Sequence, residues 1–486
     1  MNAAREYVWL AIALCIGAIA IFWRLTDASP FLDEAFTLSV AAQPVPQLLA
    51  LVASSDNSPP LFHLLTHALL WLHLASWDYR WFVAPFGFIT IAAAWGIAQQ
   101  LFGGRAAGVA ALVTATSPLL VDWDRMYRMY APFVALSVLS WWLLLLMREG
   151  PAGPRLFFEE TDRSRRTPIL ATLYVACAAS LPLLHYVGIG VLASQAAYAL
   201  VRPRARRPVA LALVVGALGL AAWVPGLREQ FGRGGSLVLS NAVYWPGLAL
   251  NLFAAYLPES VTALRPWVEW FMSALVLGIV AAALWRGGRT PLPLMLAPAL
   301  AQIGVSALIG KNLVNPRYLL YVQPLFAVCV GCVAASSGRM RLAGIAAALV
   351  VLGCDVAGLQ NLLLDPYYQR TDWYAVAALL VTKEQPDDAI VLDQGYMHYV
   401  VDDLNGFRGH PTFRIDSSAS VQEVRAWLQT HHSRRVWYVE NQFYYPDPTR
   451  AVFAFLQATR PALGTYQQRR SSPGDSASVV LFGPAR

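Results

Sequence analysis

The sequence predicts a polytopic α-helical membrane protein that carries a small α/β domain at its carboxyl end. Of the 486 residues, 57% are hydrophobic and only 13% are charged, which is about half the charged fraction of a soluble protein. Several segments come close to the roughly 20 apolar residues that cross a bilayer. From about residue 361 onward, charged and alternating segments replace the apolar runs, which indicates a folded domain outside the membrane.

Apolar windows predict about eleven transmembrane helices. The predicted spans lie near residues 7–25, 80–101, 106–121, 131–147, 168–183, 185–201, 209–226, 266–285, 291–310, 319–336 and 342–360. The first span lacks a small-residue cleavage site, so we expect an uncleaved anchor rather than a signal peptide.

Loop charges predict the orientation of these spans. With the N-terminus in the cytoplasm, every cytoplasmic loop is basic, and two loops contain the dense runs TDRSRR and RPRARR. The C-terminal domain is then extracytoplasmic. Because orientation accounts for the net charge of +7, we expect the lipid bilayer as a partner and no nucleic acid. A multi-pass protein of the plasma (inner) membrane fits this pattern.

One long first outer loop, residues 26–79, is predicted to hold two interfacial helices. The segment Ser58–Trp77 is apolar enough to span, but counting it as a span would place TDRSRR outside. We therefore expect it to lie in or dip into the outer interface. Val45–Ala53 is expected to be a second, shorter interfacial helix.

The tail predicts a small α/β domain, so the chain divides into a transmembrane domain, residues 1–360, and an extracytoplasmic domain, residues 361–486. Three strands and three helices alternate along it, which favours a mostly parallel sheet. The predicted strands are DAIVLD, RRVWYVEN and SASVVLFG, and the predicted helices are TDWYAVAALLVTKEQ, VQEVRAWLQTHH and TRAVFAFLQATR.

The adjacent carboxylates Asp33 and Glu34 lie just past the first apolar span. An ionised aspartate can take the proton of an attacking hydroxyl or hold a divalent cation. The alternative is a solvated loop that keeps the end of the helix in water.

The segment VDWDRMYRMY places Asp122, Asp124, Arg125, Arg128 and Tyr130 in the second outer loop. Arginine binds phosphate through two parallel hydrogen bonds, and aromatic rings can line a sugar or lipid site. Alternatively, Asp124 and Arg128 form an i, i+4 pair within a helix.

Four further ionisable residues lie at predicted outer helix ends, where such groups are functional candidates. They are Arg80, His185, Lys311 and Arg317. Lipid-headgroup contact for the basic residues and ordinary packing for the lone histidine are the alternatives. His63 and His67 have i, i+4 spacing but lack the glutamate of a zinc-protease motif.

Together these features resemble the GT-C glycosyltransferases that use polyprenyl-phosphate sugars. The pattern consists of a DE pair after the first span, a PPLF segment, an arginine entering the next span, an Arg–Tyr cluster, a histidine in a short turn and an NPRY segment. It is similar to the protein O-mannosyltransferase and aminoarabinose transferase group, including RgtA/B/C/D-like and family 39-like enzymes. The resemblance covers about residues 5–330.

The resemblance implies an inverting transfer from a polyprenyl-phosphate-linked sugar donor to an extracytoplasmic acceptor. It makes Asp33 the catalytic aspartate and Glu34 its acidic neighbour, and it places Arg80, Arg128 and Arg317 at the lipid phosphate. Ser58 stands where aminoarabinose transferases have a lysine, so Arg125 or Lys311 is expected to substitute.

No cofactor is required by this mechanism, although a divalent cation is left open because some relatives use one. The competing interpretations are a transporter or flippase for lipid-linked sugars and a non-catalytic scaffold. A transporter would favour inverted repeats and broken helices near the midplane, and the sequence has no such symmetry.

Overall fold

The computed structural model of the chain describes most of its 486 residues. The described ranges are residues 3–148, 163–232, 245–258, 264–309, 314–393, 395–403, 410–415, 421–431, 435–441, 447, 449–468 and 476–485.

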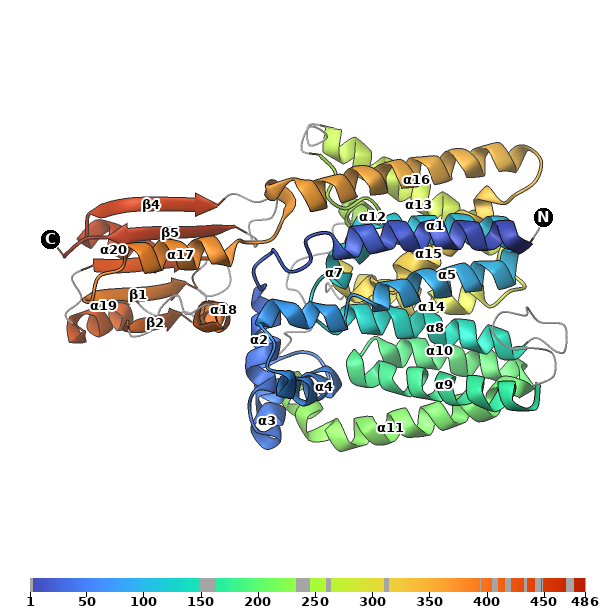
Figure 1. The fold of residues 1–486 in the computed structure, drawn as a ribbon, viewed down its shortest axis with the longest axis horizontal. Coiled ribbons are helices and arrows are strands. Elements are labelled where there is room, and N and C mark those ends of the chain that lie inside the picture. The colour runs from blue at the N-terminus through green and yellow to red at the C-terminus, as the bar shows by residue number, and fades with distance from the viewer. Residues whose placement is uncertain are drawn as a thin grey trace. The chain divides into compact units, whose positions relative to one another are not determined.

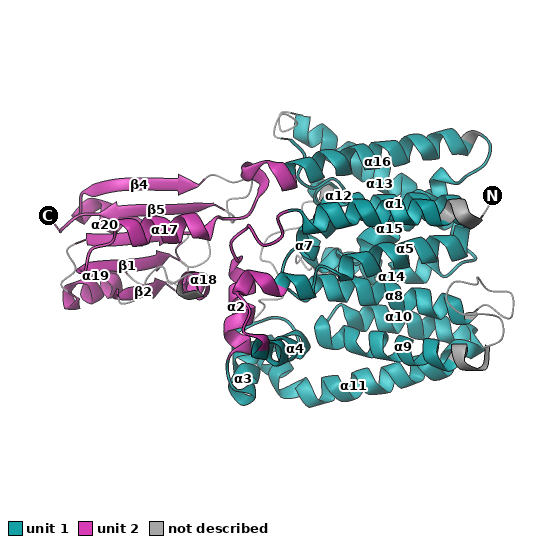
Figure 2. Ribbon diagram, in the orientation of Figure 1, with its two compact units in different colours: residues 1–23, 43–71, 80–361 teal, residues 24–42, 72–79, 362–486 magenta. Residues whose placement is uncertain are grey.

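The described residues form two compact units, which Figure 2 distinguishes by colour. The helical unit comprises residues 1–23, 43–71 and 80–361. The α/β unit comprises residues 24–42, 72–79 and 362–486, so it takes in two pieces of the predicted first outer loop as well as the tail.

The helical unit is built from long apolar helices together with several short ones (Figure 1). Their bounds are α1 Ala3–Phe22, α3 Val45–Ser55, α4 Leu61–Leu69, α5 Phe86–Phe102, α6 Gly104–Thr116, α7 Pro118–Asp124, α8 Tyr130–Arg148, α9 Arg163–Leu184, α10 Gly188–Val201, α11 Pro203–Gly232, α12 Trp245–Phe253, α13 Arg265–Gly287, α14 Leu292–Ile309, α15 Val322–Ala334 and α16 Arg339–Leu364. The 3-10 turns are η1 Leu70–Leu72, η2 Ser76–Phe82 and η5 Pro316–Leu319.

Each of the eleven predicted spans overlaps in sequence with one or two of these helices. Within the described ranges, five helices are long and apolar enough to cross a membrane, and a sixth span results if the bent pair α6–α7 is counted. This pair bends by 60°. Ser117 is extended and Pro118 opens α7, because a residue before proline is disfavoured in the helical region. The total of eleven spans remains a prediction.

The segment expected to lie in the interface forms a helix that is too short to cross a bilayer. Only Leu61–Leu69 is α-helical, followed by the 3-10 turn Leu70–Leu72. At about 1.5 Å per residue, this helix reaches about 14 Å, less than half of the hydrocarbon thickness. The second expected interfacial helix is α3, which is 11 residues long.

The α/β unit contains a five-stranded sheet in the order β2-β1-β3-β5-β4. Its elements are α2 Leu32–Ala41, η6 Pro366–Tyr368, α17 Trp373–Lys383, β1 Asp388–Asp393, η7 Gly395–Met397, α18 His398–Asp403, β2 Thr412–Ile415, α19 Val421–Thr430, β3 Arg435–Glu440, α20 Ala451–Thr459, β4 Ala462–Gln468 and β5 Ala477–Phe482. Side chains of α17 and α18 pack on one face of the sheet, and those of α19 and α20 pack on the other.

The prediction of a mostly parallel sheet is wrong. β1 pairs in parallel with β2 and β3, but β5 pairs antiparallel with both β3 and β4. β4 was not predicted because most of its side chains are exposed or half-buried, so this edge strand lacks the run of apolar residues that marks a buried strand. The hairpin that β4 forms with β5 turns that half of the sheet antiparallel.

Candidate functional site

A tight loop between α3 and α4 presents a buried carboxylate in the helical unit. Asp56 ends α3, and Pro59 and Pro60 lead into α4. The N–H of Asn57 donates to Asp56 Oδ1 over 2.6 Å, and the Ser58 hydroxyl donates to Oδ2 over 2.9 Å. The loop therefore fixes the carboxylate with its own donors and with two prolines that restrict the backbone.

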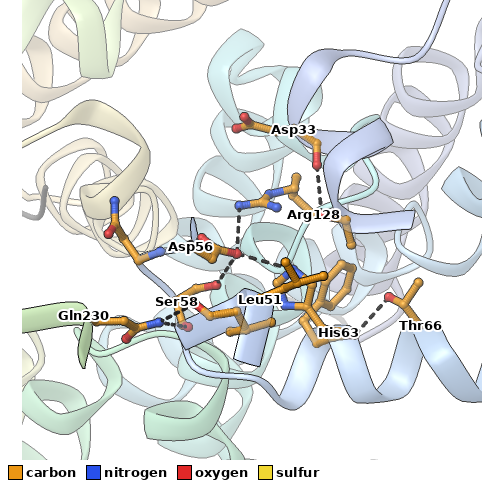
Figure 3. Close-up of polar contacts among 12 residues, drawn as sticks. Asp33, Leu51, Asp56, Ser58, His63, Thr66, Arg128 and Gln230 are labelled. Carbon is orange, nitrogen blue, oxygen red and sulfur yellow. Dashed lines mark hydrogen bonds and ion pairs between the residues drawn. The ribbon is translucent and has the colours of Figure 1, made fainter. Parts of the chain in front are cut away.

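This carboxylate lies between a histidine and an arginine from different parts of the chain. Asp56 Oδ2 is 3.3 Å from His63 Nε2 on α4 and 3.8 Å from Arg128 Nη2, just before the start of α8. Dashed lines in Figure 3 join Asp56 to Ser58, His63 and Arg128. All three ionisable side chains are buried. Since a buried charge is costly without a partner, Asp56 and Arg128 stabilise one another.

The protonation states follow from this arrangement. Burial raises the pKa of Asp56, but the Arg128 guanidinium, His63 and the donors of Asn57 and Ser58 outweigh it and hold this pKa below its usual range. Burial lowers the pKa of His63 to about 4, which Asp56 opposes and Arg128 reinforces. At neutral pH the group therefore contains one carboxylate, one guanidinium and a neutral imidazole.

Aromatic rings connect the neighbouring predicted residues. The Tyr130 ring lies 5.8 Å from the ring of His185, in the turn between α9 and α10, and this ring lies 5.2 Å from Tyr318. The Arg317 guanidinium lies 5.2 Å above the Tyr318 ring, a cation–π geometry. Burial lowers the pKa of His185 to about 3, with Arg317 as the next cause. The structure thus brings Tyr130, His185 and Arg317 together around a neutral imidazole.

Arg128 and Asp56 belong to the same electrostatic neighbourhood, because Asp56 raises and Arg128 lowers the pKa of His185. Asn315 fixes the backbone at Arg317 by accepting the N–H of that residue over 3.1 Å. The second outer loop and the NPRY segment lie far apart in the sequence. The fold nevertheless makes both contribute to one polar region of the helical unit.

A buried glutamine ties the helix α11 to this region. Gln230 Nε2 donates to the carbonyls of Val52 and Ser58 over 3.1 and 3.0 Å. Its Oε1 accepts from the Tyr186 hydroxyl over 2.5 Å, and Trp223 Nε1 donates to that hydroxyl over 2.9 Å. The carbonyl of Ser58 is thereby held by a distant helix, which fixes the loop that carries Asp56 (Figure 3).

The structure describes four other predicted residues of the helical unit, each with its own surroundings. Asp122 accepts from the Tyr256 hydroxyl over 2.8 Å, and Arg125 Nη1 donates to the Ala20 carbonyl over 3.0 Å. Asp124 is buried beside Gly87, where an added Cβ would meet its Oδ2 at 2.5 Å. Arg80 is only 4% exposed. Their assignment to the site remains a prediction. Lys311 lies outside the described residues.

In the α/β unit, the paired carboxylates of α2 face different surroundings. Glu34 is buried and accepts the N–H of Phe31 over 2.8 Å, which caps the first turn of the helix. Asp33 is half-buried, and the Tyr396 hydroxyl donates to its Oδ1 over 3.4 Å. One carboxylate thus closes the helix start, whereas its neighbour keeps part of its surface accessible.

Sequence reasoning did not assign to the site four residues that the structure makes prominent: Asp56, His63, Gln230 and Tyr396. The run DNSPPLFH contained the only usable signal, since an acidic residue before two prolines and an apolar helix marks a rigid polar turn. Within the described ranges, no three His, Cys, Asp or Glu side chains gather so that they could hold a metal ion.

Comparison with known proteins identifies the fold. No protein-family model matches the sequence, and no curated protein matches it. The crystal structure of ArnT from Cupriavidus metallidurans in the apo state matches with a TM-score of 0.54 at 15% identity, over 99% of this chain and 98% of that chain. ArnT bound to undecaprenyl phosphate matches with a TM-score of 0.52 at 16% identity and the same coverage.

An archaeal protein has the same fold. The oligosaccharyltransferase AglB from Archaeoglobus fulgidus, in complex with an inhibitory peptide and a dolichol-phosphate, matches with a TM-score of 0.51 at 12% identity, over 99% of this chain and 74% of that chain. The chain therefore has the GT-C fold of these structures and is a multi-pass membrane protein. The resemblance predicted from sequence is confirmed at the level of the fold.

Proposed function

We propose that this chain is an integral-membrane inverting glycosyltransferase that moves a sugar from a polyprenyl-phosphate donor to an extracytoplasmic acceptor. One observation carries the proposal: over its whole length the chain shares the fold of ArnT, which has been crystallised with undecaprenyl phosphate. The buried arginines of the helical unit supply the cations that a lipid phosphate requires.

Arg128 is the residue best suited to the donor phosphate, with Arg317 and Arg80 as its partners in this role. Arg128 is 5% exposed and Arg80 is 4% exposed, so a phosphate beside them would interact in a low dielectric. Asp56 keeps the Arg128 side chain in place before any ligand arrives. A preorganised cation stabilises developing negative charge without reorganising during the reaction.

Asp33 is proposed as the general base. Its carboxylate takes the proton of an acceptor hydroxyl or amine while that oxygen or nitrogen forms a bond to the anomeric carbon. The bond from that carbon to the phosphate oxygen breaks, and its electron pair leaves with the polyprenyl phosphate. Attack on the face opposite the leaving group inverts the anomeric configuration. A positioned base contributes about 10²–10⁴-fold to such a rate.

The acceptor is proposed to be a lipid, polysaccharide or protein outside the cytoplasm. Basic loops on one side predict a cytoplasmic N-terminus and an outer C-terminal domain in the plasma membrane. Arginines suffice for a monophosphate leaving group, and a divalent cation remains an open part of the proposal.

The glycan profile of cells with the chain, without it and with Asp33→Asn tests the proposal. We expect one sugar to disappear from one glycoconjugate in the deletion, and the Asp33→Asn cells to match the deletion. The matched control is Asp27→Asn, since Asp27 belongs to the same unit and forms an exposed pair with Arg24 at 2.6 Å.

The possible outcomes distinguish a catalytic role of Asp33 from a structural one. If the sugar is missing from the deletion and from Asp33→Asn cells but present in Asp27→Asn cells, the result supports transfer with Asp33 as base. The glycoconjugate that lacks the sugar then gives the acceptor class. Asp33→Asn cells with a wild-type profile would make the carboxylate structural and would favour transport of a lipid-linked sugar instead.

A further inference from the structure

The helix that carries Asp33 belongs to the hydrophobic core of the α/β unit. Leu32 and Ala35, which flank Asp33 and Glu34 on α2, are 1% and 3% exposed and join a cluster with Trp373, Met397 and other side chains of the sheet domain. Figure 2 shows α2 in the same colour as the sheet. The helix comes from the N-terminal part of the sequence, whereas these partners come from the tail.

Further contacts fix α2 along its length. The Phe36 ring lies 5.2 Å from the rings of both Tyr396 and Tyr399. Just before α2, the Ser29 hydroxyl donates to the Thr371 carbonyl over 3.1 Å and accepts the N–H of Trp373 over 2.9 Å. Packing and hydrogen bonds together therefore hold this short helix on the sheet domain, and a helix of this length is marginal without such support.

The topology of the sheet places the contacts of α2 at one edge. β1 lies between its parallel neighbours β2 and β3, so the carboxyl ends of the three strands lie at the same edge of the sheet. Open α/β sheets bind their ligands at this edge. Here η7 and α18 follow the carboxyl end of β1, and their residues Tyr396, Met397 and Val400 contact or cluster with α2.

We propose that Tyr396 is a positioning residue for Asp33, and that the C-terminal domain acts in the reaction by holding α2. The Tyr396 hydroxyl donates to Asp33 Oδ1 over 3.4 Å, a long bond of the kind that tightens in a catalytic complex. Fixing one oxygen sets the plane of the carboxylate, and so sets where the other oxygen points. This inference rests on the proposed role of Asp33 as base.

The test uses the full-length protein with Tyr396→Phe, which removes the hydroxyl and keeps the ring that packs on Phe36. We expect kcat for sugar transfer to fall about tenfold, the range for one hydrogen bond to a charged group. The KM for the donor and the melting temperature should stay at wild-type values. The matched control is Tyr466→Phe, since the Tyr466 hydroxyl interacts with Lys383 at the exposed strand β4.

A second background separates positioning from general damage. In Asp33→Glu the longer side chain moves the carboxylate away from its position beside Tyr396, so adding Tyr396→Phe should reduce kcat by less than about twofold. An unchanged kcat in the single variant Tyr396→Phe, or an equal tenfold loss in both backgrounds, would overturn the inference. Failure of the proposed function looks different, because the wild-type protein itself would then show no Asp33-dependent transfer.

Discussion

The helical unit and the α/β unit treat their charged groups in opposite ways. Arg128 in the helical unit is 5% exposed and lies against the buried carboxylate Asp56. Asp33 in the α/β unit is half-buried, on a helix whose apolar side is fixed in the domain core. A cation for phosphate gains strength from a low dielectric, whereas a base must reach a proton on its substrate.

The comparison teaches that each unit preorganises its group by different means. Pairing with Asp56, which lies in a turn with two prolines, holds Arg128, because a buried charge requires a partner. Hydrophobic packing holds α2, so Asp33 gains its position without being buried. Changes in the first group should therefore cost stability as well as donor binding, and changes around the second should cost mainly turnover.

The largest expected effect on stability is that of Arg128→Ala. Removing the guanidinium takes away the ion-pair partner that lies 3.8 Å from the buried Asp56, which should lower the free energy of unfolding by about 3–5 kcal/mol. Unfolding in detergent by heat or denaturant measures it. Arg24→Ala breaks an exposed pair of 2.6 Å and should cost about 0–1 kcal/mol. An equal fall in the free energy of unfolding in both variants would show that the buried Asp56–Arg128 pair stabilises the fold no more than an exposed pair does.

The next effect is a pH dependence in the α/β unit. Burial raises the pKa of Asp393 to about 7, with Glu440 and Asp447 adding to it and Tyr438 and Arg450 opposing it. The folded state therefore keeps a proton that the unfolded chain releases at about pH 4. The free energy of unfolding should fall by about 1.4 kcal/mol for each pH unit between about 4 and 7 through this group.

Hydrogen exchange of β1 and β3 in the full-length protein measures that slope. Asp393→Asn removes the titration and keeps an oxygen that can accept from Tyr438, so the variant should lose this part of the pH dependence. If wild type and variant show the same slope from about pH 5 to 7, Asp393 does not titrate in this range.

A smaller loss is expected for Gln230→Leu. The substitution deprives the carbonyls of Val52 and Ser58 of their donor and the Tyr186 hydroxyl of its acceptor, which should cost about 1–3 kcal/mol. Gln47→Leu on the exposed side of α3 is the control and should change the melting temperature little. A melting temperature that Gln230→Leu leaves unchanged would argue against the bridge from α11.

The smallest effect is expected at Glu34. Glu34→Ala removes the acceptor for the Phe31 N–H and should destabilise the start of α2 by about 1 kcal/mol. Glu34→Gln keeps an acceptor oxygen and should cost less. Amide exchange rates along α2 report both variants, and equal rates in the two would mean that Glu34 does not cap the helix.

Much of the helical unit could be predicted because long apolar windows need no tertiary information. Each predicted span lies over helix, and the tail helices and strands with apolar faces, such as Val421–Thr430 and Arg435–Glu440, also follow from their patterns. The exposed strand β4 could not be found this way. Nor could the place of α2 be predicted, since its apolar side packs against a domain that the distant tail of the chain forms.

Part of the candidate site could be predicted from the sequence. Positive charge in the loops placed Arg128, His185 and Arg317 on one side of the membrane, and the structure groups them in one neighbourhood. The pairing of Asp56 with Arg128 joins the first predicted outer loop to the second. The residues around a loop carboxylate do not indicate which distant arginine it will meet. This contact therefore could not be predicted from the sequence.

The most direct test of the proposed transferase activity is sugar transfer by purified protein in proteoliposomes. The donor is the lipid extract of cells that lack the chain, in which unused polyprenyl-phosphate sugar should accumulate. Wild type and Asp27→Asn should transfer the sugar with inverted anomeric configuration, and Asp33→Asn should be slower by about a hundredfold or more. Equal transfer by Asp33→Asn, or a product that retains the configuration, would contradict an inverting transfer with Asp33 as base.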